Sequence, residues 1–222
     1  MTSFQFDPAA APDGRGKVTV GGDLQPGTLL AAYRAGLFPM RQPDGQLAWW
    51  SPDPRAIIIP GAVPISRSLR QSQRHVTTTV NHAFERVIRA CADRGPDEYA
   101  WITEEVQAAY IELHRLGWAH SVETWATESS GGPELVGGLY GVCIGGLFAG
   151  ESMFHHRRDA SKVALLTLLA VIGGGEHPDE RLIDVQWMTP HLQSLGAIDL
   201  PRAEFLERSR RAQDLSPPPR LR

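Results

Sequence analysis

The sequence predicts an α+β protein, with a small N-terminal domain over residues 1–62 and a larger domain over residues 63–222. In the larger segment, three successive strand patterns precede a helix, a fourth strand and a final helix, an order typical of a layered α+β domain. The first segment is rich in Gly, Pro and aromatic residues. A length of 222 residues accommodates one domain with a small appendage.

Hydrophobic periodicity predicts the elements of the first half. Residues 26–35 carry apolar side chains at helical spacing, and Gly36 ends this helix. Two prolines exclude a helix in the following Trp-rich run, and residues 55–60 are predicted to be a short strand. Two longer helices are predicted over residues 81–93 and 103–116, the second opened by a capping threonine and two glutamates.

The second half changes to strand patterns at His120. Three strands, joined by an SSGGP turn and a Gly-Gly hairpin signal, are predicted over residues 121–127, 134–144 and 147–154. The sequence then predicts an apolar helix over residues 161–172, opened by Asp159 or Ser161, and a strand over residues 182–187. A short helix ending at Gly196 and a last helix over residues 203–212 follow. We expect the final SPPPRLR segment to be a frayed tail.

Composition points to a cytoplasmic protein. The N-terminal segment has neither a basic region nor an apolar core, so it is not a secretory signal. The longest apolar run, residues 163–172, is too short to cross a membrane. Cys91 and Cys143 lack metal-ligand spacing, and a chain of this size does not need a disulfide.

The distribution of charge is more informative than its sum. A net charge of −3 argues weakly against nucleic-acid binding. Basic zones nevertheless lie within residues 63–94, 155–162 and 202–222, and they permit a limited contact with phosphates. From charge alone, such basic zones are more often ordinary solvated surface than phosphate-binding sites.

Several kinds of chemistry find little support. The chain has no Gly-x-Ser-x-Gly elbow, no P-loop and no dinucleotide fingerprint. His155 and His156 are adjacent on a predicted strand, so they point to opposite faces and are poor joint metal ligands. A covalent or metal-dependent mechanism therefore has little support in the sequence.

Two strands carry polar residues where apolar ones are expected. In IDVQW, Asp184 and Gln186 share one face, about 7 Å apart along the strand. In LFAGESMF, alternation places Ala149, Glu151 and Met153 on one face. Such residues are either satisfied structural groups or functional ones. If Glu151 is a structural group, we expect it to form an ion pair with Arg157 or Arg158. If it is functional, we expect a cationic partner such as a substrate ammonium.

Two further signals are weak by themselves. In HHRRDASK the chain turns from strand to helix, where backbone N–H groups and Lys162 could hold a phosphate or a terminal ribose. An ordinary capped helix is the alternative. Six tryptophans offer platforms for stacking nucleobases, although most tryptophans in proteins are core or boundary residues.

Taken together, these segments resemble one family, the leucyl/phenylalanyl-tRNA–protein transferases. The similarity runs from about Gly21 to Phe205 through many ordered blocks of unusual composition. They are GGDL at 21–24, YRAGLFP at 33–39, WWSPDPRA at 49–56, SRSLR at 66–70, WIT at 101–103, AHSVETW at 119–125, LVGGLYGV at 135–142, GESMF at 150–154, ASK at 160–162, IDVQ at 183–186, HLQSLGA at 191–197 and LPR at 200–202.

The resemblance implies a function. Members of this family transfer Leu or Phe, and less well Met, from aminoacyl-tRNA to proteins that begin with Arg or Lys, which creates an N-terminal degradation signal. It also implies an acetyltransferase-like C-terminal domain, no metal or cofactor, and substrates that are aminoacyl-tRNA and protein. We expect a monomer with no membrane association.

The resemblance also assigns roles to residues. It implies that Asp184 polarises Gln186, which helps to draw a proton from the attacking amine; orienting the amine and the ester carbonyl is the safer role. Glu151 lies near the cationic N-terminal substrate. The remaining substrate-binding residues that it implies are Leu139 and Phe148 for the apolar side chain, Trp101 and Tyr110 for the terminal adenosine, and Tyr33, Ser152 and Met153.

Two departures from the family pattern stand out. Met40 occupies the position after Phe-Pro where the family usually has an aromatic residue stacked on the adenosine, and a thioether stacks more weakly. Trp49 is the nearby aromatic expected to compensate. The SSGGP turn at residues 129–133 looks like an insertion that lengthens a hairpin.

Two other functions remain open at this stage. An acyl-CoA enzyme of the same fold usually has a Gly-rich loop before the helix, where this chain has RRDASK without glycine. A non-catalytic RNA-binding or degradation-adaptor module would tolerate the loss of Asp184 and Gln186.

Overall fold

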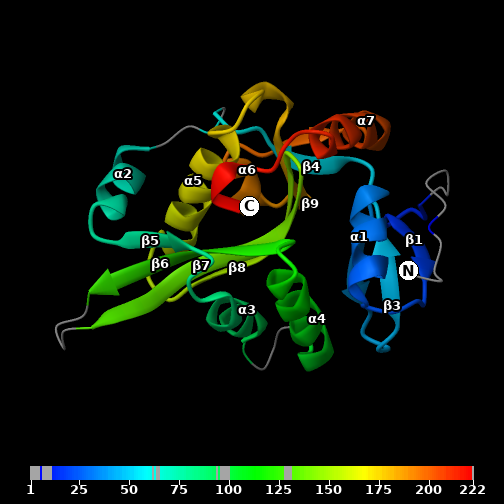
Figure 1. The fold of residues 1–222 in the computed structure, drawn as a ribbon, viewed down its shortest axis with the longest axis horizontal. Helices are drawn as coiled ribbons and strands as arrows, with labels where there is room; N and C mark the ends of the chain where they lie inside the picture. Colours follow the sequence, from blue (N-terminus) through cyan, green and yellow to red (C-terminus); the bar gives the residue numbers. More distant parts are fainter. Residues whose placement is uncertain are drawn as a thin grey trace.

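The computed structural model contains two sheets, which Figure 1 shows side by side. It describes residues 6, 12–61, 63, 66–93, 95, 101–127 and 132–221. Within these ranges, no helix is both long and apolar enough to cross a membrane. The predicted SSGGP turn lies mostly outside the described residues.

The N-terminal unit is a three-stranded sheet covered by one helix. Its helix α1 (Pro26–Arg34) ends one residue earlier than predicted, and the sheet order is β1-β3-β2. The strands, none of which was predicted, are β1 (Lys17–Val20), β2 (Phe38–Arg41) and β3 (Leu47–Trp50). They are only four residues long, too short for alternation to be read in the sequence.

The larger sheet has seven strands in the order β10-β4-β9-β8-β7-β6-β5. All neighbours are antiparallel except β8 and β9, which are parallel. The strands are β4 (Arg55–Ile58), β5 (Thr77–Val80), β6 (Ala119–Thr127), β7 (Pro133–Ile144), β8 (Leu147–His155), β9 (Leu182–Gln186) and β10 (Ile198–Leu200). Strand β4 thus belongs to the larger sheet by its pairing, while the division of the chain at residue 62 stays a prediction.

Helices cover both faces of this sheet (Figure 1). On one face lie α3 (Phe84–Ala92) and α4 (Glu104–Arg115), and on the other α2 (Arg67–Gln73) and α5 (Ala160–Gly173). Near β4 and β9 lie α6 (Pro190–Ser194) and α7 (Arg202–Gln213). Helix α4 begins as predicted, because the Thr103 side chain accepts the Val106 N–H.

The ends of the elements agree with the predictions only in part. Helix α5 is opened by Asp159, one of the two predicted residues, with a φ of 64°; its side chain makes no capping bond and instead accepts from Ser72. The C-terminal segment is not frayed, because the 3-10 helix Pro219–Leu221 forms and Leu221 is buried. Helix α2 and strands β5 and β10 were not predicted.

A bulge in β8 changes the predicted facing of its side chains. Gly141 of β7 pairs with Gly150, and Tyr140 pairs with Ser152, so Glu151 is the extra residue. The alternation therefore reverses after Glu151. Contrary to the prediction, Met153 packs in the apolar cluster that contains Phe148, not in the one that contains Ala149.

The bulge depends on glycine at position 141. A Cβ atom there would lie 2.2 Å from the carbonyl oxygen of Ala149 and 2.5 Å from the ring of Phe148. Gly141→Ala should lower the free energy of unfolding by about 1–3 kcal/mol, as overpacked cores do. Urea unfolding measures this, with Gly132→Ala as the control because nothing lies within 4 Å of its Cβ position. Equal stability of the two variants would contradict the close packing.

Candidate active site

A cavity of about 470 Å³ opens where strands β8 and β9 separate. The parallel pairing of the two strands ends at Ala149 and Asp184, so the residues that follow on each strand diverge. The cavity floor is apolar and comes from β7, β8, β9 and α5, while β2 of the N-terminal unit closes one side. An apolar side chain can therefore be enclosed between the two units of the protein.

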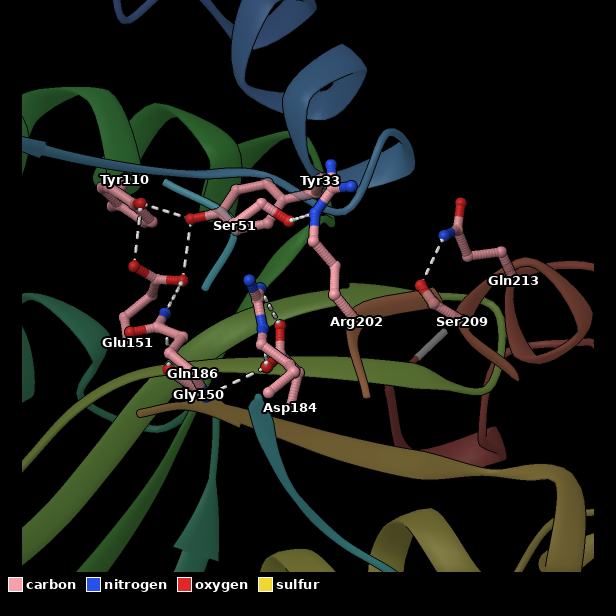
Figure 2. A network of polar contacts seen from close by, with 11 residues as sticks. Tyr33, Ser51, Tyr110, Gly150, Glu151, Asp184, Gln186, Arg202, Ser209 and Gln213 are labelled. Carbon is pink, nitrogen blue, oxygen red and sulfur yellow. Dashed lines mark hydrogen bonds and ion pairs between the residues drawn. The ribbon is translucent and has the colours of Figure 1, made fainter. Parts of the chain in front are cut away.

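Glu151 lies at the polar end of this cavity, and its residue surface is only 8% exposed. The Tyr33 hydroxyl lies 2.8 Å from Glu151 Oε1, and the Tyr110 hydroxyl lies 3.1 Å from Oε2, both within hydrogen-bond distance. The two tyrosine hydroxyls also form a hydrogen bond with each other. Figure 2 shows the two tyrosines, one from α1 and one from α4, meeting at this carboxyl group.

Counting hydrogens indicates the protonation state of this triad. Its three contacts need three hydrogens, and the two tyrosine hydroxyls supply only two. All three contacts are hydrogen bonds at once only when Glu151 carries the third hydrogen. A neutral Glu151 therefore fits the geometry best.

The electrostatic environment of Glu151 leads to the same conclusion. Burial raises the pKa of the Glu151 carboxyl to about 8, although the hydrogen bonds from Tyr33 and Tyr110 lower it and Asp184 and Arg55 act in opposite directions. Burial, with the nearby Glu151, also raises the pKa values of both tyrosines well above their usual range. The tyrosines therefore stay protonated, and Glu151 exchanges a proton near neutral pH.

Gln186 faces Glu151 across the cavity mouth. Its side-chain Nε2 donates to the Gly150 carbonyl at 3.1 Å and to Glu151 Oε1 at 3.4 Å. A carbonyl only accepts, so the atom facing Gly150 must be the nitrogen. Among the described residues no hydrogen bond involves Gln186 Oε1, and this oxygen is the group of the amide that can accept a hydrogen bond from a ligand.

Asp184 lies behind the cavity in a buried ion pair with Arg55. The Arg55 Nε and Nη2 atoms donate to its two oxygens at 2.8 and 2.6 Å. Asp184 Oδ1 also accepts the main-chain N–H of Gln186 at 3.0 Å. The described contacts thus join Asp184 to the main chain of Gln186. The predicted polarising role requires a contact with the side-chain amide of Gln186, and the described residues show none.

The structure brings most of the predicted site residues together. Those lining the cavity are Met40, Trp101, Leu139, Phe148, Glu151, Ser152, Met153 and Gln186. Asp184, Tyr33 and Tyr110 are buried behind this wall and reach the cavity through the hydrogen bonds described above. Tyr110 is fully buried, so a direct contact with the adenosine is not available to it in this structure.

Trp49 does not belong to the cavity. Its side chain is fully buried in β3, and its Nε1 donates to the Gly21 carbonyl at 2.8 Å. The expectation that Trp49 compensates for Met40 by stacking on a base is therefore wrong. The tryptophan run at this point forms the core of the N-terminal unit.

The HHRRDASK segment contributes less than expected. Arg157 and Arg158 are exposed, and neither pairs with Glu151, so the ion-pair explanation for Glu151 is excluded. Lys162 is half-buried and forms an ion pair with Asp159 at 3.4 Å. In the part of the chain that the structure describes, no group of three or more His, Cys, Asp and Glu residues could hold a metal ion.

Sequence reasoning missed two contributors to the site. Arg55 was assigned only to a strand, although an arginine within the apolar run that starts β4 was a signal of a buried partner. Trp187 was predicted on a strand face, but it closes the cavity beside β2, where its ring meets Phe38 edge-on at 4.8 Å.

Comparisons with known proteins assign the chain to a class. A family model described as "Leucyl/phenylalanyl-tRNA protein transferase N-terminal domain" matches residues 22–53, and "Leucyl/phenylalanyl-tRNA protein transferase" matches residues 57–210. The protein is therefore a transferase that moves an amino acid from tRNA to protein. It belongs to the leucyl/phenylalanyl-tRNA–protein transferase family, which confirms the resemblance seen in the sequence. The predicted α+β class with a separate small N-terminal domain is also confirmed, while the acetyltransferase-like architecture of the larger domain stays a prediction.

Curated relatives carry the same family name. The protein from Shewanella sp. (strain MR-4) is 48% identical over 208 residues, covering 92% of this chain and 85% of the relative. The protein from Idiomarina loihiensis is 45% identical over 223 residues, covering 97% and 90%. A solved tandem GNAT protein from the clavulanic acid biosynthesis pathway aligns with a TM-score of 0.36 at 14% identity, over 86% of this chain and 60% of its own.

The neutral Glu151 predicts a dependence of stability on pH. Because its pKa of about 8 lies above the usual value of 4.5, the folded state binds more protons than the unfolded state between these values, and stability falls as pH rises through this window. Glu151→Gln removes the titration. Relative to the wild type, the variant should gain on the order of 4 kcal/mol between pH 4.5 and pH 9.

Urea unfolding at several pH values measures this difference. Glu134→Gln, an exposed site on the neighbouring strand β7, is the control and should follow the wild type. Parallel pH curves for the wild type and Glu151→Gln would show that Glu151 has an ordinary pKa.

Proposed function

We propose that this protein transfers Leu or Phe, and less well Met, from aminoacyl-tRNA to the N-terminal Arg or Lys of acceptor proteins. The transfer forms a peptide bond and creates an N-terminal degradation signal. Aminoacyl-tRNA and acceptor proteins are its partners, and it acts as a monomer in the cytoplasm without a cofactor.

One observation carries the proposal. The cavity combines an enclosed apolar floor with a polar end at which Glu151 and Gln186 lie in hydrogen-bond contact. An aminoacyl ester needs this combination, because its side chain is apolar and its carbonyl carbon must meet an amine. A pocket of this kind discriminates side chains by shape, at about 1–3 kcal/mol per methylene group.

The reaction depends on removing a proton from the amine and supplying one to the leaving oxygen more than on activating the ester. The α-amine of the acceptor attacks the ester carbonyl, the new C–N bond forms, and the bond to the tRNA 3′-oxygen breaks. The amine loses a proton and the leaving oxygen gains one. Because the ester is already activated and an α-ammonium has a pKa of about 8, positioning and a matched proton acceptor suffice.

The residues supply these two requirements separately. Gln186 Oε1 accepts a hydrogen bond from the amine and so orients it toward the ester. Glu151 lies beside it, and its ionised form, a minority at pH 7 because the pKa is about 8, accepts the proton that the amine loses. Leu139 and Phe148 hold the side chain of the transferred amino acid, with Ser152 and Met153 along the same wall.

The adenosine of the tRNA 3′-end belongs at the side of the cavity that faces the N-terminal unit. Met40 from β2 and Trp101 from the segment before α4 line this side. With Trp49 buried elsewhere, Trp101 is the aromatic residue available for stacking there.

Transfer itself is tested with radiolabelled Leu-tRNA and a peptide that begins with Arg. We expect label in the peptide, and none in the same peptide with an acetylated N-terminus, because the free amine is the nucleophile. Peptides that begin with Arg, Lys and Glu test the acceptor preference. Absence of transfer while the tRNA remains charged would refute the proposal.

The adenosine site is tested by restoring an aromatic residue. Met40→Trp should lower KM for the aminoacyl-tRNA about 5-fold, because stacking on a base contributes about 1–3 kcal/mol. Trp101→Ala should raise KM by a similar factor or more. Met188→Trp, near the cavity but not on its wall, is the control, and an equal response there would contradict the assignment.

A further inference from the structure

We propose that Arg55 is a positioning residue for transfer, because through Asp184 it holds the main chain of Gln186 in the conformation that aims its amide into the cavity. The inference rests on the proposed function of this cavity. It concerns a residue that does not touch the substrate.

The guanidinium of Arg55 is held by Asp184 and by two aromatic rings, while its Nη1 atom makes no hydrogen bond among the described residues. Its fork donates to both oxygens of Asp184, and the residue is only 1% exposed. The rings of Phe38 and Phe205 lie 4.7 and 4.5 Å from its central carbon. A planar cation between two aromatic rings and a carboxylate has one available orientation.

The Asp184 carboxylate, held by Arg55, in turn restrains the main chain of Gln186. Asp184 Oδ1 accepts the Gln186 N–H, and Gln186 has a φ of 69°, in the left-handed region that favours glycine. Such a conformation costs about 1–2 kcal/mol in a non-glycine residue, so other contacts must hold it. The pairing of β4 and β9 is also irregular here, because Ala56 faces Gln186 while Ile57 faces Asp184.

The left-handed turn determines where the side chain points. In a regular strand, Gln186 would lie on the same face as Asp184, behind the cavity. At its actual φ, the amide instead reaches the Gly150 carbonyl and Glu151 and lines the cavity. Figure 2 shows Gln186 extending from Asp184 toward Glu151.

Lysine cannot replace this function of Arg55. An ammonium keeps the charge beside Asp184 but provides no planar fork and no stacking between the rings. In Arg55→Lys the carboxylate can rotate, and the Gln186 main chain can relax toward the extended region. Misplacement of a catalytic group by about 1 Å can lower a rate about 100-fold.

A second buried arginine provides a matched control. Arg181 is 2% exposed and precedes β9, at the end of the strand away from the cavity. It donates to the carbonyls of Glu176 and Ser216 and makes no described contact with the site. Arg181→Lys therefore removes a buried guanidinium directly before β9 without changing the contacts of Gln186.

The experiment compares Arg55→Lys with Arg181→Lys at a temperature where both are folded. We expect Arg55→Lys to lower kcat about 10- to 100-fold, with KM for aminoacyl-tRNA within about 2-fold of the wild type. Arg181→Lys should keep the wild-type kcat. A wild-type kcat in Arg55→Lys, or an equal loss in both variants, would overturn the proposal.

Hydrogen exchange tests the positioning without relying on activity. The amide of Gln186, read from a peptide covering residues 182–189, should exchange faster in Arg55→Lys than in the wild type or Arg181→Lys. Unchanged exchange there would overturn the proposal even if kcat fell. If the wild type itself shows no transfer, the proposed function fails, and the exchange result still decides the role of Arg55.

A milder variant covers the case in which Arg55→Lys does not fold. Phe205→Leu removes one of the two rings beside the guanidinium and leaves the fork intact. We expect a kcat about 3- to 10-fold lower with unchanged KM, and faster exchange at Gln186. A wild-type kcat and wild-type exchange in this variant would overturn the proposal.

Discussion

The buried ion pair of Arg55 and Asp184 holds the parts of this protein together. Arg55 lies on β4, which follows the N-terminal unit, and Asp184 lies on β9 in the middle of the larger sheet. The aromatic rings beside the pair come from β2 and α7. Removing one partner would leave a buried charge uncompensated, which typically costs about 3–5 kcal/mol. The site is therefore built around this pair.

Two departures from regular strand geometry then create the site. The bulge at Glu151 turns its carboxyl toward Tyr33 and Tyr110, and the left-handed Gln186 turns its amide toward Glu151. The Glu151 carboxyl and the amide nitrogen of Gln186 have partners supplied by the fold before any substrate is present. This arrangement avoids the reorganisation that a flexible site would need, and it keeps Glu151 neutral near pH 7.

The sequence was sufficient for most long elements. Strands β6, β7 and β8 were predicted within two residues, because two-residue alternation and hairpin signals are strong over such lengths. The bulge was not predictable, since an extra residue does not alter composition, and so Met153 was placed on the wrong face. The burial of Trp49 and the pairing of Arg55 depend on contacts between segments far apart in the chain. Family resemblance supplied the site residues but not the contacts between them.

The central claim is that the cavity receives the aminoacyl end of the tRNA. A crystal structure with 3′-deoxy-3′-phenylalanylamino-adenosine, whose amide replaces the reactive ester, tests it most directly. We predict the phenyl ring between Leu139 and Phe148, the adenine against Met40 and Trp101, and the acyl carbonyl carbon beside the amide of Gln186. An analogue bound elsewhere, or bound with its side chain outside the cavity, would contradict the account.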